Sequence, residues 1–236
     1  MEYPLLKPLI FAHRGASAVE PENTLAAFSR AFHDGADGLE FDIRATINRE
    51  IVIIHDSTVD RTIKNGTGIV KELTLTELRK FDFGHGEKIP TLEEVLKLFG
   101  NTYWLNIEIK EKRLEKTLVD MLTDLKITKR LVISSFIPET LRKVKELNAS
   151  IPTALLFTNP FTSLKKVRKS LHCEGIHPHK SIVTKRLLSR AAQFGLITRT
   201  WTVDKPDLAV KLAKMGVQTL ITNNPKVLSD TFQALK

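Results

Sequence analysis

Seven ionisable residues stand at the ends of short apolar runs or interrupt them: His13, Arg14, Glu40, Asp42, His55, Glu108 and Lys110. Glu40 and Asp42 are two positions apart, as are Glu108 and Lys110, so each pair shares one face of an extended strand while the residue between them points away. Ionisable groups inside apolar strands are costly to bury without partners. This spacing therefore predicts that the groups lie together at a common site, where each has others as its charged or hydrogen-bonded partners.

Three of these residues are carboxylates that would repel one another if they converged without a cation between them: Glu40, Asp42 and Glu108. Ligation by oxygen alone suits a hard divalent ion, whereas zinc more often recruits histidine or cysteine. The sequence thus predicts a divalent metal cofactor, Mg²⁺ or Ca²⁺, at these acids. For each acid taken singly, a structural salt bridge to Arg14 or Lys110 is an alternative.

The remaining four residues favour chemistry on a phosphate ester. Arg14 offers a forked set of donors and Lys110 a point charge, and both suit a tetrahedral anion better than a metal. His13 and His55 can serve as general base and general acid, although the sequence does not say which is which. Singly, either histidine could be no more than the polar end of a strand or a loop residue.

Eight short apolar runs alternate with amphipathic segments along the chain, at residues 9–13, 38–43, 103–110, 131–136, 153–157, 174–178, 197–203 and 218–222. Helices with capping residues Asn23, Thr184 and Asn224 are expected between runs. Eight such repeats in 236 residues predict a parallel (βα)8 TIM barrel, in which the carboxyl ends of the strands face one site. A doubly wound sheet is the alternative fold, but no GxGxxG motif follows the first run.

Two segments depart from this alternation. Residues 51–56 return as a second strand after 38–43, and a tight turn at Asn48 and Arg49 would place Asp42 opposite His55 in an antiparallel hairpin. Residues 57–90 are too long for an ordinary barrel loop and predict a small insertion within a single domain of residues 1–236.

The composition is that of a globular chain with a basic bias. Lysine and arginine number 36 against 27 acids, a net charge of +9, and Cys173 is the single cysteine, so no disulfide is expected within the chain. The basic residues are dispersed, which favours a solvated surface over an anionic partner. We expect a cytoplasmic protein, a monomer or homodimer, with no nucleic-acid partner and no stable membrane insertion.

Nine motifs occur in an order and spacing that cover nearly the whole chain: AHRGASAVEPENTLAAF, GADGLEFDIRAT, IVIIHDSTVDRT, GTGIV, IPTLEEVL, LNIEIK, ISSF, IHPHKSIVT and TWTVD. Together they resemble the bacterial glycerophosphodiester phosphodiesterases of the short cytoplasmic type. The resemblance implies a (βα)8 barrel with a small insertion after the second strand. It also implies hydrolysis of glycerophosphodiesters to glycerol 3-phosphate and an alcohol.

By this resemblance, His13 and His55 are the catalytic pair, Glu40, Asp42 and Glu108 bind the metal, and Arg14 and Lys110 contact phosphate. Further substrate contacts are expected from Trp201, as an aromatic wall for glycerol, and from Phe136, although either could serve packing alone. His177 and His179 are expected to line the pocket, and Glu22 to brace the loop that carries His13 and Arg14. Asn223 is neutral where the family frequently has aspartate, so no metal role is assigned to it.

Two other functions are compatible with the same residues. A lysophospholipase D-type enzyme would need an apolar groove, for which FDFGHG in the insertion supplies two phenylalanines. A non-catalytic protein that binds a phosphorylated ligand would not need two histidines and three acids together. Whether water or a substrate hydroxyl attacks first is open in the enzymatic alternatives.

Overall fold

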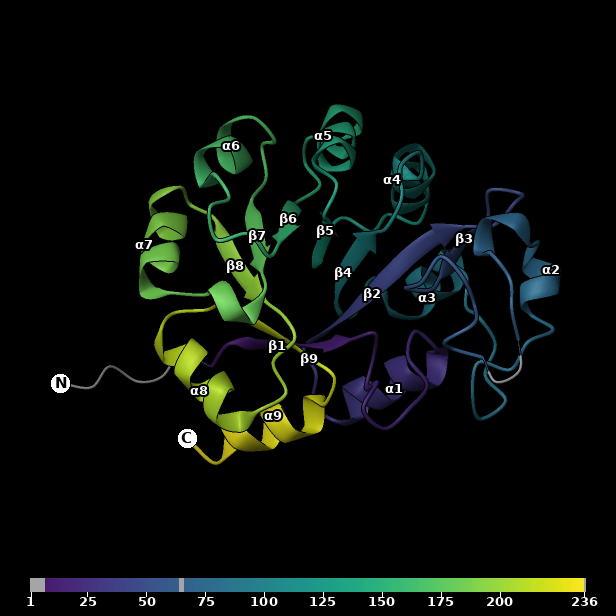
Figure 1. Cartoon of the computed structure of the whole chain (residues 1–236), viewed down its shortest axis with the longest axis horizontal. Helices are drawn as coiled ribbons and strands as arrows, with labels where there is room; N and C mark the ends of the chain where they lie inside the picture. Colours follow the sequence, from purple (N-terminus) through teal and green to yellow (C-terminus); the bar gives the residue numbers. More distant parts are fainter. Residues whose placement is uncertain (1–6, 64–65, 236) are drawn as a thin grey trace.

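Eight parallel strands form a closed barrel in the computed structural model, which describes residues 7–63 and 66–235 (Figure 1). The barrel strands are β1 (Leu9–His13), β2 (Gly38–Ala45), β4 (Trp104–Ile109), β5 (Leu131–Ser135), β6 (Thr153–Phe157), β7 (Gly175–Pro178), β8 (Ile197–Thr200) and β9 (Thr219–Thr222). Neighbours run β1-β9-β8-β7-β6-β5-β4-β2, and β1 pairs with β2 to complete the ring. The predicted barrel is confirmed, and the doubly wound alternative is wrong because its sheet would stay open.

Helices form the outer layer around these strands, as Figure 1 shows. They are α1 (Leu25–His33), α2 (Leu75–Leu78), α3 (Leu92–Phe99), α4 (Glu115–Asp124), α5 (Pro138–Leu147), α6 (Leu164–Lys169), α7 (Lys185–Gln193), α8 (Pro206–Lys214) and α9 (Pro225–Gln233), with 3₁₀ turns η1 (Val70–Glu72) and η2 (Lys180–Ile182). Within the described ranges, every helix is too short or too polar to cross a bilayer.

Side-chain caps begin several of these helices. Thr184 and Asn224 cap α7 and α9 as predicted, each accepting a hydrogen bond from a backbone N–H in the first turn. The predicted cap Asn23 is wrong, because the Thr24 hydroxyl accepts from Ala27 N and begins α1. Asn23 instead turns its side chain toward the barrel, where Nδ2 donates to Asp42.

Side chains along each strand point alternately toward the outer helices and toward the barrel axis. Phe41 of β2 packs on Phe28 of α1, with ring centroids 5.6 Å apart. Glu40 and Asp42, on either side of Phe41, therefore point to the opposite face. The strand pattern thus brings acids into the barrel while keeping the helix interface apolar.

β3 (Ile51–Ile53) returns antiparallel to β2, but in a register one residue from that predicted. Ile43 pairs with Ile53, and Ile54 N donates to Asp42 O at 3.0 Å, so Ile54 rather than His55 is opposite Asp42. The loop has three residues, closed by a bond from Thr46 N to Glu50 O, with Arg49 in the left-handed region at φ 68°. Three-residue hairpin loops commonly end in this conformation, which the expected two-residue turn did not allow for.

The segment 57–90, for which an insertion is predicted, packs beside β3 at the right of Figure 1. Its described residues include η1 and α2, and residues 64 and 65 lie outside them. Its apolar side chains form a cluster of their own with two residues of the hairpin, which comprises Val52, Ile54, Val59, Ile63, Val70, Leu78, Phe83 and Ile89. This packing fixes the loop that begins at His55 from its outer side.

The exit from β1 depends on two consecutive left-handed residues, Arg14 at φ 58° and Gly15 at φ 82°. A Cβ on Gly15 would lie 2.7 Å from the carbonyl carbon of Ala27, closer than a real contact allows. Gly15 therefore allows the loop to turn against α1, and this turn aims His13 and Arg14 at the barrel mouth.

Gly15→Ala should destabilise the fold by more than about 1 kcal/mol, because the new methyl group meets both an unfavourable φ and the backbone of α1. Gly86→Ala is the matched control, since Gly86 has φ 83° but nothing within 4 Å of its added Cβ. Urea unfolding of both variants measures the difference. Equal losses in the two variants would show that the contact with Ala27 contributes nothing.

Candidate active site

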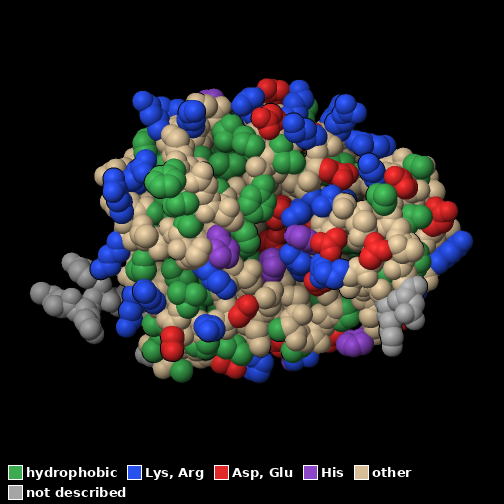
Figure 2. Space-filling model, viewed as in Figure 1, with side chains coloured by type: hydrophobic (Ala, Val, Ile, Leu, Met, Phe, Trp, Pro, Cys, Tyr) green, Lys and Arg blue, Asp and Glu red, His purple; other side chains and the backbone are tan. Residues whose placement is uncertain are grey.

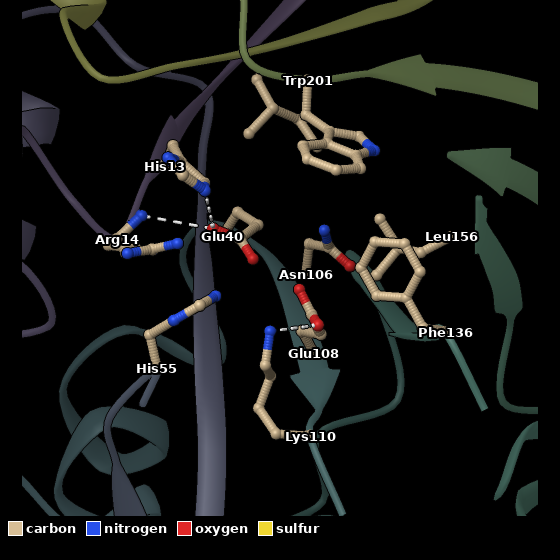
Figure 3. Close-up of a pocket in the computed structure, with 11 residues that line it drawn as sticks. His13, Arg14, Glu40, His55, Asn106, Glu108, Lys110, Phe136, Leu156 and Trp201 are labelled. Atoms are coloured by element: carbon tan, nitrogen blue, oxygen red, sulfur yellow. Dashed lines mark hydrogen bonds and ion pairs between the residues drawn. The ribbon is translucent and has the colours of Figure 1, made fainter. Parts of the chain in front are cut away.

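A cavity of about 270 Å³ opens at the carboxyl ends of the barrel strands. Figure 2 shows acidic, basic and histidine side chains gathered around a central hollow on this face. The residues that line the cavity are His13, Arg14, Glu40, His55, Asn106, Glu108, Lys110, Phe136, Leu156, Trp201 and Ile221 (Figure 3). Most of the residues singled out in the sequence thus come together in one place.

The three predicted metal ligands converge within this site. Asp42 and Glu108 are register partners across β2 and β4, and Glu40 lies two residues earlier on β2. Each of the three carboxylates offers one oxygen within 4.8 Å of the others, and all three residues are buried. Carboxylate oxygens at this spacing fit the oxygen ligation that Mg²⁺ and Ca²⁺ prefer, so this cluster can hold such an ion.

The electrostatics of the three acids show how costly the cluster is without a cation. Burial, followed by repulsion from Asp42, raises the pKa of Glu108 to about 7, and the same causes raise the pKa of Glu40 well above its ordinary range. Burial also acts to raise the pKa of Asp42, but Lys110 and Arg14 outweigh it and hold that pKa below its usual value. Charge is thus concentrated on Asp42, with two acids beside it that favour a proton or a metal.

Arg14 and Lys110 both contact Asp42, with Arg14 Nε 3.4 Å and Lys110 Nζ 3.5 Å from its carboxylate oxygens. Lys110 Nζ also donates to Glu108 at 2.6 Å. Asn23 adds a hydrogen bond from Nδ2 to Asp42 at 3.1 Å. These partners satisfy Asp42 while the two cations still line the cavity, where an anionic group would meet them.

His13 and His55 lie on the same side of the cavity, on either side of Arg14 in Figure 3. Burial is the main cause that lowers the pKa of each imidazole. The His13 Nδ1 lies 2.7 Å from Asn223 Oδ1, which places Nε2 toward Glu40 at 3.9 Å. The His55 Nδ1 lies 2.6 Å from Asp56 Oδ1. The two rings therefore have different partners, a neutral amide and a carboxylate.

Arg61 of the insertion ties the histidine side of the cavity together. Its Nε donates to Asp56 at 2.5 Å, and its NH groups donate to both oxygens of Glu22 at 2.7 and 2.8 Å. Glu22 in turn accepts from Arg14 at 3.0 Å, so it braces the loop after β1 as predicted. One guanidinium thus links the partner of His55 to the partner of Arg14.

An apolar wall faces the ionic side across the cavity. The rings of Trp201 and Phe136 meet edge to face, with centroids 5.7 Å apart, and Leu156 and Ile221 extend the same wall. Trp201 Nε1 donates to the carbonyl of His177 at 2.9 Å, which fixes the indole in place. The site therefore presents charge on one side and an aromatic surface on the other, as a small molecule with a phosphate and an alkyl portion requires.

The prediction that His177 lines the pocket is wrong. Its side chain is fully buried, near enough to Arg199 to be affected by its charge, and lies outside the set that lines the cavity. Burial, followed by the charge of Arg199, lowers the pKa of His177 well below its ordinary value. His179 packs edge to face on Trp201 at 5.0 Å and lies outside the cavity lining as well.

Four residues that bond to the histidines or to their partners were given no role from the sequence: Asp56, Arg61, Asp204 and Asn223. The same holds for three residues of the cavity lining, Asn106, Leu156 and Ile221. Asp56 directly follows His55, and Arg61 follows in DRT, so their places beside a candidate catalytic residue were a usable signal. Asp204 and Asn223 gave none, because they meet only after β8 and β9 pair.

The fold is a (βα)8 barrel, and a cavity lined by acidic side chains and histidines opens at the carboxyl ends of its strands. The glycerophosphoryl diester phosphodiesterase family model matches residues 13–227, and the chain belongs to this family.

Individual relatives agree with that membership. The chain is 37% identical over 236 residues to a glycerophosphodiester phosphodiesterase of Caldanaerobacter subterraneus, covering 94% of this chain and 97% of the relative. A glycerophosphodiester phosphodiesterase of Bacillus altitudinis is 32% identical, with 92% and 94% covered. Among solved structures, an Oleispira antarctica phosphodiesterase in complex with the product sn-glycerol-3-phosphate superposes with a TM-score of 0.88 at 28% identity, covering 96% and 97% of the two chains.

A divalent cation should stabilise the protein, because it relieves the repulsion among Glu40, Asp42 and Glu108. At one hundred times its Kd, Mg²⁺ or Ca²⁺ raises the free energy of unfolding by about 2.7 kcal/mol. Thermal unfolding with EDTA and with each metal measures this. The shift should vanish in Glu40→Gln/Asp42→Asn and persist in Glu93→Gln, which removes an exposed carboxylate of α3. The same melting temperature with and without metal in the unmutated protein would contradict a metal site.

Proposed function

We propose that this protein is a metal-dependent phosphodiesterase that hydrolyses glycerophosphodiesters to glycerol 3-phosphate and an alcohol by histidine general acid and base catalysis. The observation that carries the proposal is a small cavity lined by two of three clustered, buried carboxylates, two cations and two histidines with different partners, with the third carboxylate, Asp42, directly behind the cations. Family membership and the product complex of the Oleispira relative support the substrate class.

Each side of the cavity suits one part of such a substrate. Arg14 and Lys110 bind the phosphodiester as a forked donor and a point charge. The aromatic wall of Trp201 and Phe136 takes the carbon face of the glycerol moiety. Glu40, Asp42 and Glu108 would hold the divalent ion, which supplies charge stabilisation to phosphate oxygens in the transition state.

The hydrogen-bond partners of the histidines support an order for their roles. The Oδ1 of Asn223 only accepts, so His13 carries hydrogen on Nδ1 and keeps a free lone pair on Nε2. His13 can therefore take a proton from the attacking oxygen. Asp56 accepts from His55 Nδ1 and acts against the lowering of the His55 pKa by burial, so His55 is the histidine better suited to give a proton to the leaving alcohol.

The insertion does not supply the apolar groove that a lysophospholipase D-type activity would need and for which its two phenylalanines were candidates. Phe83 is buried in the cluster of the insertion and Phe81 packs against that cluster, so neither lines the cavity. The apolar surface that does reach the cavity belongs mainly to β5, β6 and β8 and their exits, and it is sized for a small group. We therefore infer glycerophosphodiesters of small alcohols as the substrates.

Release of glycerol 3-phosphate from glycerophosphocholine, followed in a coupled assay, tests the proposed function. Turnover should fall below detection in EDTA and return with Mg²⁺ or Ca²⁺. Cleavage of lysophosphatidylcholine gives choline and lysophosphatidic acid, so the two substrates are compared by the release of choline. Lysophosphatidylcholine should react at least about tenfold more slowly, since its acyl chain exceeds the cavity. Full activity in EDTA would contradict the metal role, and a preference for the lysophospholipid would overturn the substrate class.

His13→Ala and His55→Ala should each lower kcat by roughly 10²- to 10⁴-fold, because each removes one proton-transfer group. Thermal unfolding should be little changed, since both side chains lie at the rim. His172→Ala, an exposed histidine before β7, is the control and should keep full activity. Near-normal turnover in either active-site variant would refute the assigned pair.

A further inference from the structure

The orientation of His13 depends on an amide that comes from the far end of the chain. Asn223, directly after β9, places Oδ1 2.7 Å from His13 Nδ1. The Ser17 hydroxyl lies 2.8 Å from the His13 carbonyl oxygen and 3.1 Å from the same Asn223 Oδ1. His13 is therefore held from the side opposite to the cavity, and its Nε2 is the atom left for chemistry.

A terminal amide can present either oxygen or NH₂, and Asp204 determines which one His13 meets. Asp204 Oδ2 accepts from Asn223 Nδ2 at 2.9 Å, and Asp204 Oδ1 accepts from Asn223 N at 2.8 Å and from the Thr222 hydroxyl at 3.0 Å. An ionised carboxylate has no hydrogen to give, so the amide must turn its NH₂ toward Asp204. The amide oxygen is then left for His13.

This choice of orientation decides whether His13 can act. With the oxygen of Asn223 toward it, Nδ1 carries the hydrogen and Nε2 keeps its lone pair. With NH₂ toward it, Nδ1 would have to accept, the hydrogen would move to Nε2, and the atom facing the cavity could no longer take a proton. The orientation of the Asn223 amide thus decides whether His13 Nε2 can accept a proton.

We propose that Asp204 and Asn223 act as a pair of positioning residues that hold His13 in the tautomer with hydrogen on Nδ1. The kinetic consequences rest on the proposed function of His13 as base, whereas the tautomer itself does not. Asp204 acts through Asn223 and does not touch the cavity. The pair differs from the arrangement at His55, where the carboxylate of Asp56 contacts the ring directly.

The effect of each single substitution follows from which hydrogen-bond donors and acceptors it leaves at positions 204 and 223. In Asp204→Asn, the NH₂ of the new amide faces the side chain of Asn223. Asn223 must then turn its oxygen toward residue 204 and its NH₂ toward His13. We expect kcat to fall by between about 10-fold and about 10⁴-fold with KM changed less than about threefold. In Asn223→Asp, an acceptor still faces His13 Nδ1, so the tautomer should be kept, and the loss in kcat that repulsion between the two carboxylates causes should be smaller than in Asp204→Asn. Asp207→Asn, an exposed acid three residues on, should leave kcat unchanged.

The exchanged pair, Asp204→Asn with Asn223→Asp, is the decisive variant. The amide now at position 204 would donate its NH₂ to the carboxylate at position 223 and accept from the backbone N–H of residue 223 and from Thr222. The carboxylate at position 223 would still accept from His13 Nδ1. Activity should therefore return to within about 10-fold of the unmutated protein, although the charge has moved. Recovery would show that the two residues act through one contact, and the tautomer of His13 separates this role from a merely structural one.

Nitrogen NMR of the His13 ring reads the tautomer without any substrate. The unmutated protein and the exchanged pair should show hydrogen on Nδ1, and Asp204→Asn should show it on Nε2. Hydrogen on Nδ1 in folded Asp204→Asn, full kcat in that variant, or no recovery in the folded exchanged pair would each overturn the proposal. If a single variant fails to fold, Asn223→Ala replaces it, and full kcat in Asn223→Ala is equally contradictory.

The two proposals fail in different ways. An unmutated protein with hydrogen on Nδ1 that does not cleave glycerophosphocholine would contradict the proposed function and leave the pair intact. An active protein whose His13 carries hydrogen on Nε2 would contradict the pair and the role of His13 as base, and would leave the proposed phosphodiesterase activity intact.

Discussion

The burial of three carboxylates at one point is the constraint on which the rest of the structure depends. Two full charges 4.8 Å apart repel by roughly 3 kcal/mol even at an effective dielectric constant of about 20. Arg14 and Lys110 offset this at Asp42, yet the pKa values of Glu40 and Glu108 stay raised. The repulsion among the three acids is therefore only partly offset by the two cations, and a divalent ion held by the same oxygens would offset the rest.

The barrel and its loops contribute differently to the site. Strands β2 and β4 supply the acids, and their hydrogen-bonded register fixes the distance between Asp42 and Glu108. Loops supply the groups that set the state of each histidine, Asp56 and Arg61 on one side and Asn223 and Asp204 on the other. The positions of the charges thus follow from the sheet, whereas the proton positions follow from segments between elements.

This division explains how much of the site could be predicted from the sequence. The two-residue alternation in GLEFDI and NIEIK was enough to place the acids on one face, because a strand allows no other arrangement. The predicted hairpin register was wrong by one residue, because the loop has three residues rather than two. The third, Arg49, adopts a left-handed conformation that an arginine in the sequence does not predict. His177 was misplaced because its position at a strand exit does not say whether its side chain reaches the barrel mouth or stays buried below it.

The bond between His13 and Asn223 joins residues 210 positions apart, and β1 and β9 must pair before it can form. Residues up to 223 must therefore be synthesised before the first strand acquires the hydrogen-bond partner of its histidine. Carboxylates, cations and the other histidine are already present in the emerging polypeptide, but the group that orients His13 is not. The nascent chain consequently holds His13 without this partner until β9 pairs with β1 and closes the ring.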